Sequence, residues 1–245
     1  MPPQMDSECR YYCYKNTRET IQSKDLKPLK LKLVFFDMDG VITDTISSWK
    51  YIHDYFETSN DRSVDKYLRG EIDDMEFIRR DVSLWRENGK PVTIDKLESI
   101  LSDVPLTKGA HECINVLQKH GLKTAIISAG LDILADRMSK ELGIDFVCAN
   151  GLKTDNDGYV TGEGLLGVRL MYKDEAVKRL VKQIGVSLEN CAAVGNSCFD
   201  IPMFEMCALS IAFNPHDDCV REAADFIVED KDLNKILPVI EPYVS

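Results

Sequence analysis

The chain lacks a long hydrophobic segment, a visible leader and any excess of positive charge. No apolar run approaches the roughly 18–20 residues that a membrane-spanning helix requires. The N-terminal stretch MPPQMDSECRYYCYK contains no apolar core typical of a secretory signal. The formal net charge of the 245 residues is −11. Because so acidic a protein binds nucleic acid or an anionic membrane poorly, we expect neither as a partner.

The eight cysteines are scattered along the chain and include no Cys-x-x-Cys pair. Disulfide frameworks are typical of short secreted chains, whereas a free buried cysteine behaves as a small hydrophobic side chain. We therefore predict a reduced, cytoplasmic protein. Cys9 and Cys13, together with His53, imitate part of a zinc site, but unpaired thiols on an N-terminal arm are the preferred interpretation.

Apolar runs of strand length alternate with amphipathic helical patterns along most of the chain. The predicted strands are 31–36, 124–128, 146–149, 191–195 and 209–213, and the predicted helices are 110–120, 131–142 and 174–184. Strands that are apolar on both sides indicate a parallel sheet covered by helices. Regular alternation of strand and helix predicts an α/β doubly wound sheet with right-handed crossovers.

Two stretches interrupt this alternation. Residues 45–106 contain no run of strand length, and we predict several helices there, forming a cap inserted into the core. Residues 151–168 carry a turn signal at Asp157-Gly158 and predict a short β-hairpin. The predicted divisions are an N-terminal extension at 1–29, a core domain at 30–44 and 107–245, and a helical cap domain at 45–106.

Two acidic residues follow the first predicted strand. Asp37 and Asp39 lie in the segment Asp-Met-Asp-Gly. In an extended chain residues i and i+2 point to one side, so the two carboxylates repel each other unless a cation relieves the repulsion. Mg²⁺ suits such a site because it binds few protein carboxylates together with waters and phosphate. An acidic turn without a function is the alternative interpretation.

Further polar residues follow the later strands. The segment Ser128-Ala129-Gly130 leads from the second strand toward a helix, which favours an anion site unless Ser128 is only a helix cap. Lys173 stands at the start of a predicted helix, where a solvated charge is the alternative. Asn196 and Asp200 follow the fourth strand and offer oxygen ligands. Ligands of doubly wound sheets bind at the carboxyl ends of the strands, so these side chains are expected to meet.

The order of these motifs, Asp-x-Asp, then Ser, then Lys, then Gly-Asn-x₃-Asp, resembles that of the haloacid dehalogenase (HAD) superfamily of phosphatases and phosphotransferases. VFFDMDGVITD, IISAG and AVGNSCFDIPMF carry the resemblance, which extends over about residues 31–240. The helical insert after the first motif, the run LTKGAHECINVLQKHGLKTAIISAGLDILADRM and the hairpin ANGLKTDNDGYVTGE look most like the phosphoserine phosphatase branch.

The resemblance implies catalytic and substrate-binding roles. Asp37 is expected to be the nucleophile that forms an aspartyl-phosphate. Asp39 is expected to protonate the leaving alkoxide and then to activate water. The segment Ser128-Ala129-Gly130 is expected to hold phosphate oxygens, and Lys173 to neutralise the charge of the phosphate and of Asp37.

The resemblance also implies a metal site and a role for the cap. Mg²⁺ is expected among Asp37, the main-chain carbonyl of Asp39, and Asn196 and Asp200 of the fourth motif. The helical insert 45–106 is expected to close over the site, exclude water and choose the substrate.

Asn196 departs from the family pattern, whose fourth motif usually opens Gly-Asp. The amide still offers an oxygen, but it removes one negative charge from the expected metal site, and Asp200 is expected to compensate in part. Phe199 stands where this branch often has Asn. The change at Asn196 puts the metal affinity in question, though not the use of a metal, and the change at Phe199 removes a polar contact expected near the phosphate.

The two positions at which the phosphoserine phosphatase branch binds its substrate also depart from the family pattern. Phosphoserine phosphatases hold the amino group with an acidic residue after the first motif, and the carboxylate with an arginine in the cap. Ile46 and Asp81 occupy the corresponding positions here, and neither forms the required ion pair. The nearby residues that offer a substitute are Asp44, Arg79 and Arg80.

The sequence therefore predicts a Mg²⁺-dependent phosphatase acting on a small phosphorylated metabolite, without a strong preference for phosphoserine. A phosphotransferase or mutase on the same fold is one alternative. A catalytically weakened, phosphate-binding protein is another, because of Asn196. A receiver domain is disfavoured, since receivers have no helical insert and carry their phosphorylated Asp on a later strand.

Overall fold

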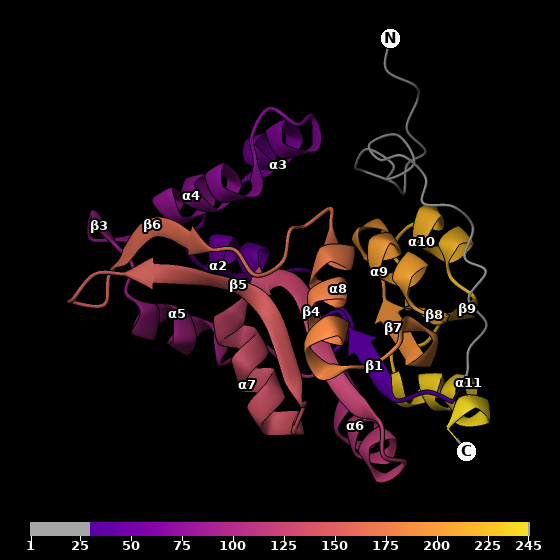
Figure 1. The fold of residues 1–245 in the computed structure, drawn as a ribbon. Coiled ribbons are helices and arrows are strands. Elements are labelled where there is room, and N and C mark those ends of the chain that lie inside the picture. Colours follow the sequence, from indigo (N-terminus) through magenta and orange to yellow (C-terminus); the bar gives the residue numbers. More distant parts are fainter. Residues whose placement is uncertain (1–29, 245) are drawn as a thin grey trace.

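A seven-stranded sheet forms the centre of the protein (Figure 1), for which a computed structural model describes residues 30–244. The predicted extension 1–29, with its two cysteines, lies outside the described residues. The strand order is β6-β5-β4-β1-β7-β8-β9. The strands are β1 Leu33–Phe36, β4 Lys123–Leu131, β5 Phe146–Thr154, β6 Val160–Leu165, β7 Cys191–Gly195, β8 Leu209–Phe213 and β9 Phe226–Val228. All neighbours pair in parallel except β5 and β6, which confirms the predicted doubly wound α/β fold.

Helices cover both faces of this sheet. The helices of one face are α6 Ala110–Lys119, α7 Asp132–Leu142 and α11 Leu237–Ile240, and those of the other are α8 Lys173–Ile184, α9 Ile201–Met206 and α10 Asp218–Ala223. Within β1, Val34 and Phe36 enter the first core and Leu33 and Phe35 the second, because successive side chains of a strand point to opposite faces. None of the described helices is long and apolar enough to cross a membrane.

The segment between β1 and β4 is mainly helical. Its helices are α2 Ser48–Tyr55, α3 Asp61–Leu68, α4 Asp74–Leu84 and α5 Ile94–Leu101. Side chains at the caps begin three of them: Ser47 accepts from Lys50 N, Asp73 from Glu76 N, and Thr93 from Lys96 N. These bonds satisfy N–H groups that lack a partner inside the helix.

The prediction that residues 45–106 contain no strand is wrong in one place. Strands β2, Arg86–Glu87, and β3, Lys90–Pro91, form a two-stranded antiparallel sheet between α4 and α5. The turn consists of Asn88 and Gly89, whose φ angles are 51° and 80°. Asn-Gly is the preferred pair for a tight hairpin with two positive φ angles, and this local signal was overlooked because the strands are only two residues long.

The predicted hairpin at 151–168 is present as β5 and β6, with Gly158 at a φ of 82° in the connecting turn. It extends from the sheet toward the helical segment (Figure 1). Ile78 of α4 lies so close to Gly164 of β6 that an added Cβ would approach its Cδ1 to 2.9 Å. Two backbone bonds, Ile94 N to Gly158 O and Val160 N to Val92 O, join the hairpin to the start of α5. Hairpin and inserted helices therefore pack against each other.

Candidate active site

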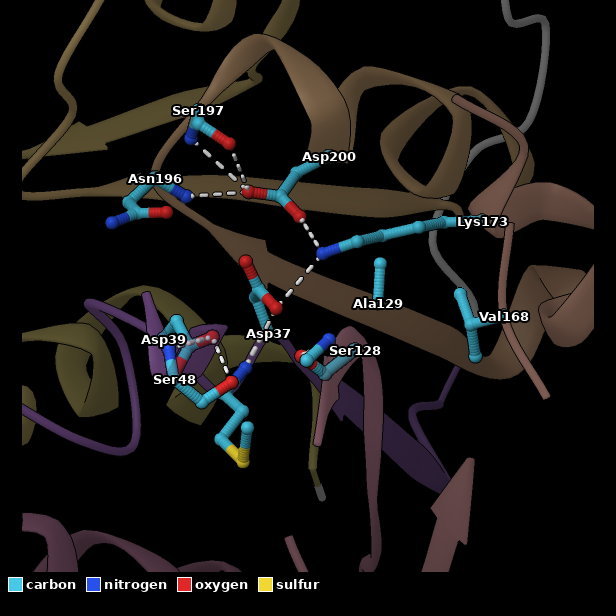
Figure 2. Close-up of polar contacts among 12 residues, drawn as sticks. Asp37, Asp39, Ser48, Ser128, Ala129, Val168, Lys173, Asn196, Ser197 and Asp200 are labelled. Carbon is cyan, nitrogen blue, oxygen red and sulfur yellow. Dashed lines mark hydrogen bonds and ion pairs between the residues drawn. The ribbon is translucent and has the colours of Figure 1, made fainter. Parts of the chain in front are cut away.

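Three charged side chains meet where β1 and β7 end. Asp37 follows β1, Asp200 follows β7, and Lys173 begins α8. The Lys173 Nζ lies 2.8 Å from Asp37 Oδ1 and 2.6 Å from Asp200 Oδ1, so the ammonium stands between the two carboxylates (Figure 2). All three residues are buried. The side chains that follow the strands therefore meet, as predicted. The alternative that Lys173 is a solvated surface charge is wrong, because only 2% of its surface is exposed.

Burial and charge set the ionisation of this triad. Burial, with repulsion from Asp200, raises the pKa of Asp37 to about 7, although Lys173 opposes the change. Burial by itself lowers the pKa of Lys173, but the charges of Asp200 and Asp37 outweigh it and hold that pKa above the ordinary value. The lysine therefore stays cationic and is the group that permits an ionised Asp37 in a buried position.

Hydrogen bonds fix Asp200 on its other side. Its Oδ2 accepts from Asn196 N at 2.9 Å and from Ser197 N at 3.1 Å (Figure 2). Gly195 makes this packing possible, since a Cβ there would lie 2.4 Å from the Asp200 Cβ. Both oxygens of Asp200 thus have partners, and the carboxylate orients Lys173.

Asp39 has one bonded and one unbonded oxygen. Its Oδ2 accepts from Ser48 N at 2.9 Å and from Ser48 Oγ at 3.0 Å, at the first turn of α2. Its Oδ1 is buried and has no hydrogen-bond partner. Burial raises the pKa of Asp39 to about 6, although the bonds from Ser48 oppose the change. A carboxyl group with such a pKa exchanges protons near neutral pH.

The segment Ser128-Ala129-Gly130 differs from its prediction. It belongs to β4, which continues to Leu131, and α7 begins only at Asp132. Ser128 is therefore neither the cap of that helix nor at its first N–H groups; its Oγ instead accepts from Gly130 N at 3.0 Å. The strand continues because β4 keeps pairing with β5 beyond an irregularity between Ile127 and Leu131.

Asn150 is a residue that the sequence interpretation missed. Its Nδ2 donates to Ala129 O at 3.0 Å and to Val168 O at 2.9 Å. Its Oδ1 accepts from Gly167 N and Val168 N. The amide therefore ties the Ser128 segment to the loop that precedes Lys173. The only local signal was an Asn-Gly pair inside an otherwise apolar strand, and it was assigned to the hairpin.

A cavity of about 730 Å³ lies over Asp37 and Lys173 of the triad. Its floor includes Asp37, Asp39, Ser128, Ala129, Gly130, Lys173 and Asn196, and its other walls include Ile46, Trp49, His53, Asn60, Phe77, Ile78 and Asp81 of the helical segment. The volume is in the range of small-molecule sites. The structure thus brings the predicted catalytic and phosphate-binding residues to one cavity, with the inserted helices facing them.

The two positions that the family resemblance assigns to substrate binding, Ile46 and Asp81, both lie at this cavity. Ile46 lines it while 74% exposed, and Asp81 lines it while buried. The suggested substitutes lie elsewhere: Arg79 and Arg80 form ion pairs with Glu76 and do not line the cavity. The position of His53 in the wall was not predicted, because its contact with residues of α4 is not local in sequence.

The oxygen donors at the floor fit a Mg²⁺ ion. Among residues 30–244 there is no group of three His, Cys, Asp or Glu side chains arranged for a metal. Asn196 approaches the backbone after Asp39 closely, since a Cβ on Gly40 would lie 2.1 Å from its Nδ2. One carboxylate, a main-chain carbonyl and an amide oxygen are donors that Mg²⁺ accepts, because it keeps several waters and binds substrate phosphate.

Comparison with known proteins agrees with this geometry. The model of the haloacid dehalogenase-like hydrolase family matches residues 34–205. The chain belongs to this family. Within it, the chain is a phosphatase of the phosphoserine phosphatase-like branch. The match begins within β1 and ends within α9, and so includes the triad and the whole inserted segment.

Individual relatives support the branch. This HAD phosphatase is 30% identical over 215 residues to the phosphoserine phosphatase of Methanocaldococcus jannaschii, covering 86% of this chain and 99% of that one. It is 31% identical over 222 residues to that of Idiomarina loihiensis, covering 86% and 97%. A substrate-bound phosphoserine phosphatase complex superposes with a TM-score of 0.72 at 29% identity, covering 86% and 99%. A phospho-aspartyl intermediate analogue of phosphoserine phosphatase gives the same TM-score, identity and coverage.

Proposed function

We propose that this phosphatase hydrolyses the phosphate monoester of a small metabolite in a Mg²⁺-dependent reaction through an aspartyl-phosphate on Asp37. One observation carries the proposal: the Asp37 carboxylate stands at the cavity floor 2.8 Å from the Lys173 ammonium, next to Asp39 with its unbonded oxygen. Lys173 favours the ionised form of Asp37, which is the form that attacks phosphorus. The phospho-aspartyl intermediate analogue of a phosphoserine phosphatase supports the same assignment.

The first step transfers the phosphoryl group to the protein. A carboxylate oxygen of Asp37 bonds to phosphorus, and the bond between phosphorus and the ester oxygen breaks with its electron pair. Protonated Asp39 gives its proton to the leaving oxygen, which departs as the alcohol. The raised pKa of Asp39, about 6, leaves part of the population protonated near neutral pH.

The second step reverses these roles. Asp39, now a carboxylate, takes a proton from a water molecule, and the water oxygen bonds to phosphorus. The bond between phosphorus and Asp37 breaks, which restores the carboxylate and releases inorganic phosphate. Lys173 lowers the energy of both steps because its charge faces the developing negative charge at the floor.

The remaining floor residues bind the phosphate and the metal. Ser128 Oγ and the N–H group of Ala129 are assigned to the phosphate oxygens, while the N–H of Gly130, first expected to bind phosphate, donates to Ser128 Oγ at 3.0 Å. Asp37, the Asp39 carbonyl and Asn196 are assigned to Mg²⁺, while Asp200 positions Lys173 in place of the ligand role first expected for it. Bound Mg²⁺ supplies charge that neutralises the phosphate in the transition state.

The division into a core domain, 30–44 and 107–245, and a cap domain, 45–106, is part of this proposal. Trp49 of α2 donates from Nε1 to Ala129 O at 3.0 Å, so the cap already contacts the phosphate-binding segment. Closure of the cap excludes water from the first step and selects the leaving group. The hairpin β5–β6 is joined to the cap by backbone bonds that involve Val92 and Ile94.

A phosphate-release assay tests the proposal. Phosphoserine, phosphoglycolate, sugar phosphates and nucleoside monophosphates are offered with Mg²⁺ and with excess EDTA. We expect release of inorganic phosphate that EDTA abolishes, and borohydride reduction of quenched enzyme converting Asp37 to homoserine. Phosphate that appears on a second alcohol instead of in solution would identify a phosphotransferase. Binding without turnover of any ester would identify a non-catalytic phosphate-binding protein.

A further inference from the structure

A buried polar pair lies in the cap wall of the cavity. His53 of α2 and Asp81 of α4 are each 2% exposed, and both line the cavity that holds Asp37 and Lys173 at its floor. The His53 Nε2 lies 3.4 Å from Asp81 Oδ2. Neither residue belongs to the catalytic or metal-binding groups assigned above, and so the pair requires a separate explanation.

Hydrogen bonds fix the protons of this pair. Trp85 Nε1 lies 3.2 Å from His53 Nδ1. Thr58 Oγ1 lies 2.8 Å from the same nitrogen. An indole N–H only donates, so Nδ1 accepts from Trp85, the Thr58 hydroxyl is placed to donate to it as well, and the ring proton stands on Nε2. On the other residue, Asp81 Oδ2 accepts from Asn60 Nδ2 at 2.7 Å. The pair therefore comprises one N–H donor and one carboxylate acceptor, on two residues that line the same cavity.

One atom of each residue is left over. Asp81 Oδ1 is buried and lacks a hydrogen-bond partner, and buried His53 Nε2 faces Asp81 Oδ2 at 3.4 Å without forming an aligned hydrogen bond. A buried donor or acceptor without a partner costs about 1–3 kcal/mol, and two adjacent ones that line a cavity indicate a site for a bound group. A hydroxyl satisfies both, because it accepts from Nε2–H and donates to Oδ1 at once. An ammonium lacks the acceptor, and a carboxylate lacks the donor.

The surrounding charges also disfavour a carboxylate. The cap residues that line the cavity include four carboxylates, of Asp54, Asp61, Asp74 and Asp81, against one lysine. That lysine, Lys50, is paired with Asp54 at 2.6 Å. No arginine is among the residues that line the cavity within the described chain. A substrate carboxylate would therefore enter an acidic wall without a bidentate partner.

The helix α2 sets the distance between this pair and the reaction. Ser48 in its first turn binds Asp39, and His53 follows five residues later. With a rise of about 1.5 Å per residue, His53 lies roughly 7.5 Å further along the helix axis. The hydroxyl that meets the pair must accordingly be several bonds from the phosphate.

We propose that the substrate of this site is the phosphate ester of a polyhydroxylated alcohol, with a hydroxyl remote from the phosphate bound between His53 Nε2 and Asp81 Oδ1. This inference rests on the proposed hydrolase function for turnover, but it makes a separate statement about binding. It explains why Asp81 stands where the branch has an arginine: the cap recognises a hydroxyl and rejects a carboxylate.

Matched esters test the specificity. D-Sorbitol 6-phosphate and n-hexyl phosphate have the same carbon chain and differ in their hydroxyls. We expect kcat/KM for the sorbitol ester to exceed that for the hexyl ester and for L-phosphoserine by about tenfold or more, which corresponds to one charged hydrogen bond. A preference for L-phosphoserine, or equal values for the two matched esters, would overturn the inference.

The variant Asp81→Asn tests the contact. It keeps the shape of the side chain and removes the charged acceptor, so KM for sorbitol 6-phosphate should rise about tenfold with kcat unchanged, while hexyl phosphate stays within about twofold. A purely structural role of Asp81 would lower activity toward both esters alike and would contradict the proposal. Asp65→Asn is the matched control, because Asp65 lies exposed on α3, paired with Arg69 and outside the cavity.

Binding separates this inference from the hydrolase proposal. Calorimetric titration of the Asp37→Asn variant, which cannot turn over an ester, is carried out with both matched esters and repeated with Asp81→Asn added. Tighter binding of sorbitol 6-phosphate that Asp81→Asn abolishes supports the inference even if the wild type releases no phosphate. Equal binding of the two esters overturns it even if the wild type is an active hydrolase.

Discussion

The Lys173 ammonium lies 2.8 Å from the Asp37 carboxylate, at 2% and 6% exposure. Removing two such charges from water is costly, and the attraction between them repays the cost only when geometry and hydrogen bonds are good. Asp37 Oδ1 also accepts from Met38 N at 2.7 Å, and Asp200 adds a second carboxylate to the lysine. The floor of the site is therefore a charged network that depends on one lysine.

Lys173→Met should destabilise the protein strongly. The substitution leaves the carboxylates of Asp37 and Asp200 buried without their counter-charge, and breaking a buried pair in this way costs about 3–5 kcal/mol. Urea unfolding at pH 8 measures the loss. Lys182→Met is the control, since Lys182 lies exposed on the same helix, and it should change the free energy of unfolding by less than about 1 kcal/mol. Equal effects of the two variants would contradict the role of Lys173.

Asp37→Asn should abolish phosphate release while the protein stays folded. The amide is a poor nucleophile and forms no aspartyl-phosphate. Phosphate release with Mg²⁺ and circular dichroism of the same sample measure both properties. Retention of even a tenth of the wild-type turnover would show that another group attacks phosphorus.

The same variant should alter the pH dependence of stability. Burial and Asp200 raise the pKa of Asp37 from 3.8 to about 7 in the folded protein, so the folded state binds more protons than the unfolded state between about pH 4 and 7. The free energy of unfolding therefore falls as the pH rises through this window and levels off above 7. Asp37→Asn removes this loss. With EDTA present, the Tm of Asp37→Asn minus the Tm of the wild type should increase from pH 5 to pH 8. A difference in Tm that is the same at both pH values would refute the raised pKa of Asp37.

Asn196→Asp should tighten Mg²⁺ binding. A carboxylate adds one charge near the proposed metal position, and pairs at such distances are worth a few kcal/mol before desolvation and repulsion from Asp37 reduce the gain. We expect about 1 kcal/mol, or roughly fivefold in apparent affinity, from Mg²⁺ titration of activity. Asn156→Asp, in the exposed turn of the hairpin, is the control. An unchanged affinity in Asn196→Asp would remove Asn196 from the metal site.

Gly40→Ala should impair the site by displacing Asn196. Gly40 has a φ of 78°, and an added Cβ would lie 2.1 Å from Asn196 Nδ2. Gly70→Ala is a matched control, because Gly70 has a φ of 71° but no atom within 4 Å of the added Cβ. Both variants should lose about 1–2 kcal/mol from backbone strain, measured by urea unfolding. Only Gly40→Ala should also raise the Mg²⁺ concentration required for half-maximal activity. Equal Mg²⁺ requirements of the two variants would contradict the contact between Gly40 and Asn196.

Local pattern sufficed for the sheet and its helices. The predicted bounds of β7 and β8 agree with the structure, and the predicted end of α6 differs by one residue. These elements are predictable because an apolar run and a 3.6-residue period both depend on residues that are close in the sequence. The turn at Asn88-Gly89 was equally local and was overlooked. Motif order along the chain then placed Asp37, Lys173 and Asp200 at the same edge of the sheet, since parallel strands bring their carboxyl ends together.

Only the tertiary structure decided how the side chains beyond these motifs are used. Asn150 reaches Ala129 and Val168, and His53 meets Asp81 and Trp85, through contacts between distant segments. No local period encodes such contacts, because they depend on where two separately folded elements pack. The sequence by itself thus determined the fold, the family and the meeting of Asp37, Lys173 and Asp200 at one edge of the sheet. The packing of α2 against α4 determined the cap wall of the cavity, because the proximity of His53 and Asp81 depends on how these two helices pack.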